Sequence, residues 1–97
     1  MKKLLLVLFL CSFGLFLHAQ ETTITGTVTD DDGLPIPGVN VTVKNSSRGT
    51  QTDFDGNYSI NAAPNETLVF TFVGLSSVER AVGTQAVINV KIGRAHV

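Results

Sequence analysis

Residues with β-branched side chains alternate with polar residues in several short segments, and each segment ends at a turn signal. Residues 22–29 place Ile24, Gly26 and Val28 on one face and threonines on the other. Residues 39–44 repeat the pattern with valines facing inward. A period of two predicts half-buried strands. From residue 20 onward no segment of ten or more residues has helical periodicity, so the pattern predicts an all-β domain.

Asp-Gly sequences mark two of the predicted turns. Asp30-Asp31-Asp32-Gly33 ends the first strand, and Asp53-Phe54-Asp55-Gly56 leads into a strand over residues 57–61. Asp caps backbone amides in such turns, and Gly accepts a positive φ without strain. Pro35 and Pro37 have no amide hydrogen to donate, so we expect an extended connector at a sheet edge around them.

The most apolar segment after residue 20, residues 68–73, is predicted to be the central strand. Leu68, Phe70 and Phe72 would face the core, and Gly74 would mark a bulge or a close backbone approach. Further short strands are predicted over residues 50–53, 77–82 and 86–90. Short strands separated by regularly spaced turns favour a sandwich or a barrel. The domain is small, so we expect a thin core and modest stability.

The first 19 residues have the three-part pattern of a secretory signal peptide. Met1, Lys2 and Lys3 form a positive start, residues 4–17 are almost entirely apolar, and Ala19 suits a signal peptidase. The alternative is a transmembrane anchor, but this apolar run is shorter than the roughly 20 residues that span a bilayer. A lipoprotein signal is disfavoured, because large apolar residues precede Cys11. We therefore expect an exported chain that begins at Gln20.

The charge and the rare residue types of the mature part exclude several function classes. Residues 20–90 carry eight acidic and three basic side chains, a net charge of −5. No basic patch is present, so nucleic acid is not an expected partner. The only histidines are His18 and His96, and the only cysteine is Cys11. Catalytic triads, Cys-His pairs and zinc sites with these ligands are therefore excluded within residues 20–90. We predict no catalytic residue, no cofactor and no metal site.

Calcium binding at the acidic turns remains an open alternative. Asp30, Asp31 and Asp32 could supply oxygen ligands, and so could the segment Asp53-x-Asp55-x-Asn57. The second segment begins like an EF-hand loop, but Tyr58 stands where that loop needs glycine and no glutamate closes it. The favoured interpretation is a pair of Asp-rich turns.

The last residues are predicted to be a non-native tail. Residues 92–97 read Ile-Gly-Arg-Ala-His-Val, which resembles the translation of a common sequencing adapter, ATC GGA AGA GCA CAC GTC. Lys91 fits the same adapter in part, so the tail is predicted over residues 91–97. The alternative is a natural basic tail. If the tail is adapter sequence, the natural protein continues beyond Val90.

The order of the turn and strand motifs resembles the carboxypeptidase-regulatory-like family of prealbumin-type β-sandwiches. The resemblance covers residues 23–90 and rests on these motifs in sequence: Ile24-x-Gly26-x-Val28-x-Asp30, Gly33, Pro35-Ile36-Pro37-Gly38-Val39-x-Val41, Gly49-Thr50, Thr52-Asp53-x-Asp55-Gly56-x-Tyr58 and Phe70-Thr71-Phe72-Val73-Gly74. It implies a small antiparallel prealbumin/transthyretin-like β-sandwich of about seven strands over residues 20–90. It implies no catalytic zinc site.

Within that family the chain is most similar to the N-terminal extensions of SusC/RagA-type TonB-dependent outer-membrane receptors. The resemblance implies a non-catalytic domain on the periplasmic side of the outer membrane, in front of a plug and barrel that this sequence lacks. It also implies nutrient uptake of glycans or peptides, with the TonB system and a SusD-like lipoprotein as partners. The alternative is a spacer or docking sandwich of another exported protein, such as a peptidase or a surface adhesin.

Overall fold

The computed structural model describes residues 21–94, which form seven strands. The predicted signal peptide and residues 95–97 lie outside this range. Among the described residues there is no helix long and apolar enough to cross a membrane. The strands in chain order are β1 (Thr22–Thr29), β2 (Asn40–Val43), β3 (Gly49–Gln51), β4 (Asn57–Ala62), β5 (Thr67–Thr71), β6 (Val78–Ala81) and β7 (Val90–Lys91).

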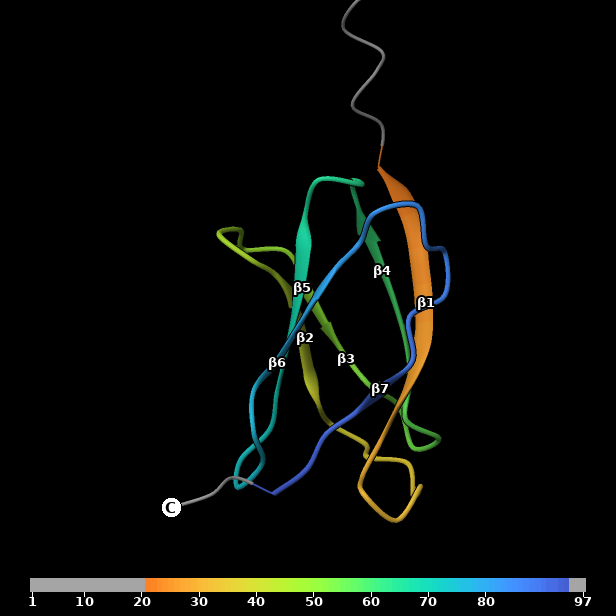
Figure 1. Ribbon diagram of the computed structural model, residues 1–97, viewed down its shortest axis with the longest axis vertical. Coiled ribbons are helices and arrows are strands. Elements are labelled where there is room, and N and C mark those ends of the chain that lie inside the picture. The colour runs from red at the N-terminus through yellow and green to blue at the C-terminus, as the bar shows by residue number, and fades with distance from the viewer. Residues whose placement is uncertain (1–20, 95–97) are drawn as a thin grey trace, which may run out of the picture.

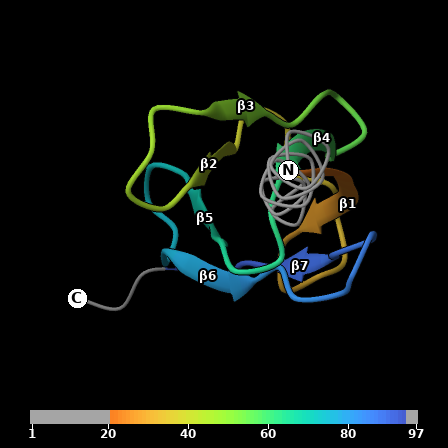
Figure 2. The ribbon, with the colours of Figure 1, turned by 90° about the horizontal axis from the view of Figure 1, so that it is seen from above.

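The strands form two sheets that pack face to face as a small sandwich (Figure 1). One sheet has the order β4-β1-β7 and the other β3-β2-β5-β6. Seen from above, β3 and β4 lie at one side of the sandwich and β6 and β7 at the opposite side (Figure 2). The predicted all-β sandwich is confirmed. The pairing is antiparallel except between β1 and β7, which run parallel.

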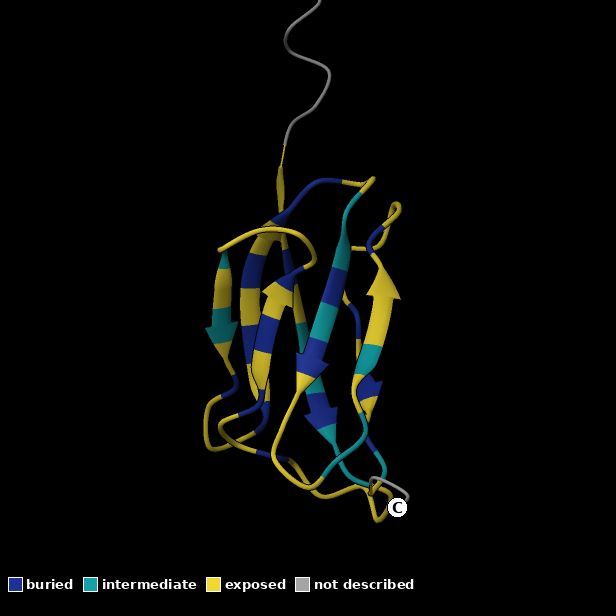
Figure 3. Ribbon diagram, turned by 90° about the vertical axis from the view of Figure 1, so that its left-hand side faces the viewer, coloured by how far each residue is buried: buried dark blue, intermediate teal, exposed yellow. Residues whose placement is uncertain are grey.

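Alternating side chains of both sheets fill the core, as the period of two predicts. Buried and exposed residues alternate along β2 and β4 (Figure 3). Phe70 of β5 packs edge-on against Tyr58 of β4, with ring centroids 5.4 Å apart and planes at 73°. The core residues that lie within the seven strands are Ile24, Val28, Val41, Val43, Tyr58, Ile60, Ala62, Leu68, Phe70 and Val90.

The predicted inward position of Phe72 is wrong. β5 ends at Thr71, and Phe72 is 37% exposed while the next residue, Val73, is 93% exposed. The amide of Leu75 donates to the carbonyl of Phe72, which closes a turn at the end of the strand. Gly74 has a φ of +82° and no atom near its Cβ position, so it serves this turn and is not a bulge. The chain leaves the sheet before the alternation can place Phe72 inside.

The last described residues join the two sheets. The amide of Ile92 donates to the carbonyl of Thr29 in β1 at 2.8 Å, and the Ile92 side chain is fully buried. One residue later, the carbonyl of Gly93 accepts the amide of Ser76, beyond the end of β5, at 3.0 Å. Residues 92–94 therefore pass from one sheet to the other. That these residues derive from an adapter stays a prediction from the sequence.

Candidate functional site

The first Asp-Gly turn uses one carboxylate to organise its own backbone. Oδ1 of Asp30 accepts the amides of Asp32 at 2.8 Å and Leu34 at 3.0 Å. The carbonyl of Asp30 accepts the amide of Gly33, which has a φ of +82°. The amide of Asp30 in turn donates to the carbonyl of Leu34. This is an Asp-capped turn with glycine in the left-handed region.

The second Asp-Gly turn has the same hydrogen bonds at the same offsets. Oδ1 of Asp53 accepts the amides of Asp55 at 2.9 Å and Asn57 at 3.0 Å. The carbonyl of Asp53 accepts the amide of Gly56, whose φ is +77°, and the amide of Asp53 donates to the carbonyl of Asn57. The predicted turn role of both Asp-Gly sequences is confirmed.

Within residues 21–94, the two candidate calcium segments do not gather their carboxylates into a group that could hold a metal ion. Asp30 and Asp53 each commit one carboxylate oxygen to two backbone amides. Asp31, Asp32 and Asp55 are exposed. Residues 21–94 contain no group of three or more His, Cys, Asp or Glu side chains placed to hold a metal ion. The prediction that the chain has no metal site stays a prediction.

A close approach at Gly26 joins β1 to the segment before β7. A Cβ atom at this position would lie 1.9 Å from the carbonyl oxygen of Ile88 and 2.9 Å from the ring of Tyr58. The Tyr58 hydroxyl reaches across and donates to that same carbonyl at 2.6 Å. Burial raises the pKa of Tyr58 to about 12. Gly26 is therefore required because any side chain at this position would collide with the Ile88 carbonyl.

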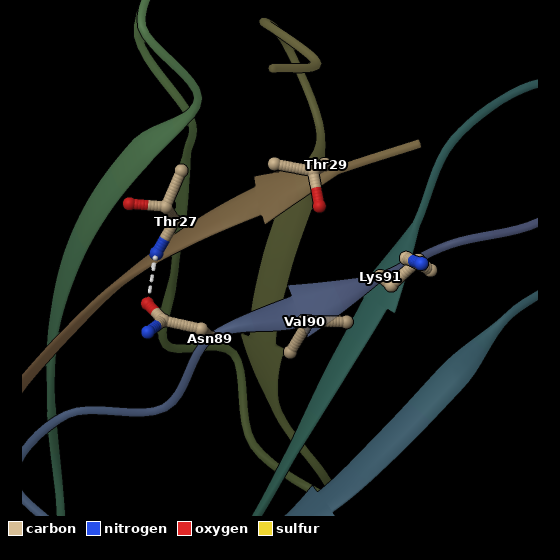
Figure 4. Close-up of a pocket in the computed structure, with 5 residues that line it drawn as sticks. All are labelled: Thr27, Thr29, Asn89, Val90 and Lys91. Carbon is tan, nitrogen blue, oxygen red and sulfur yellow. Dashed lines mark hydrogen bonds between the residues drawn. The ribbon is translucent and has the colours of Figure 1, made fainter. Parts of the chain in front are cut away.

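Beside this contact, the side chain of Asn89 takes the place of a backbone carbonyl in the pairing of β1 with the segment that leads into β7. The amide of Thr27 donates to Oδ1 of Asn89 at 2.9 Å (Figure 4). Thr27 and Asn89 line an open hollow of about 370 Å³ together with Thr29, Val90 and Lys91. Its lining offers hydroxyls, an amide and one ammonium, with no carboxylate and no histidine. These hydroxyl, amide and ammonium groups can donate hydrogen bonds.

An ion-pair network lies at the far end of the sandwich, where β1 begins. The Arg48 guanidinium contacts the carboxylates of Glu21 and Glu66. Oε1 of Glu66 also accepts the amide of Ala63 at 2.8 Å. That backbone hydrogen bond, assisted by Arg48, lowers the pKa of Glu66. The network holds the start of β1 against the loops that follow β2 and β4.

The sequence did not indicate Arg48, Asn89 or the Tyr58 hydroxyl as structural polar groups. Their partners lie far away in sequence, for example 62 residues between Thr27 and Asn89. A close backbone approach was predicted at Gly74 but lies at Gly26, where a glycine on the inward face of a strand was the available signal.

Comparison with known proteins assigns the chain to a family. The family model of the CarboxypepD_reg-like domain matches residues 24–95. The chain is 43% identical over 90 residues to TonB-dependent receptor P3 of Formosa agariphila, covering 91% of the chain. It is 40% identical over 83 residues to TonB-dependent receptor SusC of Bacteroides thetaiotaomicron, covering 81% of the chain.

A solved structure has the same fold. A chain in the crystal structure of a type II cohesin–X-dockerin complex from Acetivibrio cellulolyticus has a TM-score of 0.57 and 25% identity. The match covers 72% of this chain and 52% of that one.

The chain spans only 9% of the length of receptor P3 and 8% of SusC. Its similarity to them therefore concerns one domain. On the family match over residues 24–95 and the sandwich formed by the strands of residues 22–91, the chain belongs to the carboxypeptidase-regulatory-like domain family.

Proposed function

We propose that this chain is the non-catalytic, periplasmic N-terminal domain of a TonB-dependent outer-membrane receptor for nutrient uptake. The observation that carries the proposal is the similarity of nearly the whole described domain to named TonB-dependent receptors, at 37–46% identity. The predicted signal peptide supports export. The contacts of Tyr58, Asn89 and Arg48 support a structural role, because each of these side chains binds another residue of the same domain.

The partners follow from the same proposal. A receptor of this kind acts with the TonB system and with a SusD-like lipoprotein, and it lies in the outer membrane through a barrel that this sequence does not contain. The domain described here would stand in front of the plug and barrel. Glycans and peptides are the proposed nutrient classes.

Sequencing the genomic locus past codon 90 tests the receptor assignment. We expect one reading frame that continues into a TonB box, a plug and a barrel, with a gene for a SusD-like lipoprotein nearby. A metal-binding catalytic domain in that place would instead support an exported peptidase, and repeated adhesive domains would support an adhesin. The same experiment shows whether codons 91–97 are genomic.

A reporter fusion tests the export step separately. Residues 1–94 fused to a phosphatase that is active only outside the cytoplasm should give activity, and the mature protein should begin at Gln20. The matched control is Leu8→Arg, which interrupts the apolar run and should leave the reporter inactive. Activity that survives Leu8→Arg, or a mature protein that retains Met1, would contradict the predicted signal peptide.

A further inference from the structure

The two sheets have four edge strands, and three of them carry features that prevent pairing with another strand. β3 has three residues and β7 has two, one of which is Lys91. β6 carries Glu79 and Arg80, both exposed. β4 differs, because it is six residues long and has neither a charge nor a proline. Edge strands without such protection are templates for an added strand.

The register shows which backbone groups of β4 face away from the sheet. The amide and the carbonyl of Thr25 both point to the β7 side of β1. The Thr25 amide donates to the carbonyl of Ala86 at 3.0 Å, and the Thr25 carbonyl accepts the amide of Ile88 at 2.8 Å. Ser59 lies opposite Thr25 in the antiparallel pair. Ser59 is therefore at a non-hydrogen-bonded position, and its amide and carbonyl point to the open edge. Asn61, two residues further, points the same way.

Hydrogen bonds to nearby side chains occupy the outward amides at the two ends of this edge. The Asn57 amide donates to Oδ1 of Asp53 at 3.0 Å. The Ala63 amide donates to Oε1 of Glu66 at 2.8 Å. The remaining outward groups are the amides and carbonyls of Ser59 and Asn61, and the Asn61 carbonyl has only a long 3.4 Å contact with Arg48. The open edge is thus a defined set of two donors and two acceptors.

Space is available beside these groups. Ser59, Ile60 and Asn61 line an open groove of about 500 Å³, together with Gly49 and Thr50 of β3 and with Ser47 and the ion pair of Glu21 and Arg48. The neighbouring edge strands β3 and β4 therefore leave a groove along the open edge of β4.

We propose that this edge pairs with β4 of a second copy of the chain. In an antiparallel arrangement with the two-fold axis at Ile60, Ser59 of each copy lies opposite Asn61 of the other. The two outward residues then exchange four hydrogen bonds, which uses every open group. The arrangement is self-complementary, as a two-fold interface requires. Ser59 and Asn61 are uncharged, so the residues that lie opposite each other do not repel, and the two β4-β1-β7 sheets become one sheet.

Sedimentation velocity on the mature chain, from micromolar to millimolar concentration, tests the proposal. We expect a dimer whose fraction rises with concentration. Ser59→Pro should abolish it, because proline removes an outward amide and leaves the ladder to β1 intact. Thr71→Lys, at an exposed position of β5 in the other sheet, is the control and should dimerise normally. A wild-type chain that stays monomeric throughout, or a dimer that survives Ser59→Pro, overturns the proposal.

A charge exchange tests the register and does not depend on how proline is tolerated. Ser59→Glu/Asn61→Glu and Ser59→Lys/Asn61→Lys should each be monomeric, because like charges lie opposite each other across the axis. An equimolar mixture of the two variants should form a heterodimer that salt weakens. Dimers of either variant alone, or no heterodimer in the mixture, would show that this register is incorrect.

Discussion

The hydroxyl of Tyr58 donates a 2.6 Å hydrogen bond to the backbone carbonyl of Ile88, and β1 runs between the two residues. In a regular parallel ladder that carbonyl would accept an amide of β1. Here the Thr27 amide pairs with the Asn89 side chain instead. One tyrosine hydroxyl therefore fixes a segment that lies on the far side of the neighbouring strand.

Tyr58→Phe should destabilise the domain while leaving its packing almost unchanged. The substitution removes the hydroxyl and leaves the Ile88 carbonyl without its partner, which costs about 1–3 kcal/mol of unfolding free energy. Urea denaturation followed by fluorescence of an attached dye or by circular dichroism measures the loss. Ser59→Ala, on the exposed face of the same strand, is the control and should change stability by less than about 0.5 kcal/mol. Equal stability of the two variants would contradict a structural role for the hydroxyl.

Stability should fall at alkaline pH because of the same residue. The pKa of Tyr58 is raised from 10.0 to about 12 in the folded state. The folded state therefore holds this proton more tightly than the unfolded state does. Its contribution is complete below pH 10 and is lost as the pH rises towards about 12. Denaturation midpoints measured across this window should decline, and the decline should be smaller in Tyr58→Phe. An identical decline in both proteins would assign it to other groups.

Phe70→Ala should remove much of the stability of this small domain. Phe70 is fully buried in β5, and its loss leaves a cavity that costs roughly 3–5 kcal/mol. Phe72→Ala is a matched control two residues away, and it should cost only about 1 kcal/mol because that ring is partly exposed. Thermal melting of both variants checks the prediction. A Phe70→Ala chain that melts with the wild type would show that β5 is not at the centre of the core.

The two Asp-Gly turns should respond differently to alanine. Gly33 and Gly56 both have positive φ, so either substitution costs about 1–2 kcal/mol in backbone strain. At Gly56 the new Cβ would also lie 2.6 Å from the carbonyl oxygen of Val28, whereas nothing lies within 4 Å at Gly33. Gly56→Ala should therefore be clearly the more destabilising in a urea titration. Equal losses would mean that strain alone decides both positions.

Calcium should leave the stability of the domain unchanged. Oδ1 of Asp30 and of Asp53 is already held by two backbone amides, and no three acidic side chains of residues 21–94 are placed together to hold a metal ion. Melting curves with excess calcium chloride and with a chelator should coincide. A higher melting temperature with calcium that disappears in Asp55→Asn would establish a site in the second turn.

The local patterns of the sequence predict the faces of most strands correctly. The alternation around Val41, Tyr58 and Ile60 places all three side chains in the core, because a strand with one buried face must keep its apolar residues in phase. Phe72 fails the same rule, since a turn begins after Thr71 and the alternation ends with the strand.

The long-range features could not be predicted from local patterns. The parallel pairing of β7 with β1 joins residues about 60 positions apart, such as Val28 and Val90. The Asn89 side chain accepts the Thr27 amide, and the Ile88 carbonyl beside it accepts the Tyr58 hydroxyl from across β1. The contacts of Arg48 with Glu21 and Glu66 likewise depend on where three separate segments meet. Such contacts follow from the completed fold.

The position of β7 sets the order in which the domain can be completed. β7, the last strand, pairs in parallel with β1, the first strand, at Val28 and Val90. A chain that emerges with its amino end first can pair β1 with β4 early, but β1 has no second neighbour in its sheet until residue 90 has arrived. The interval before that moment is the time in which an emerging chain exposes its core to other proteins.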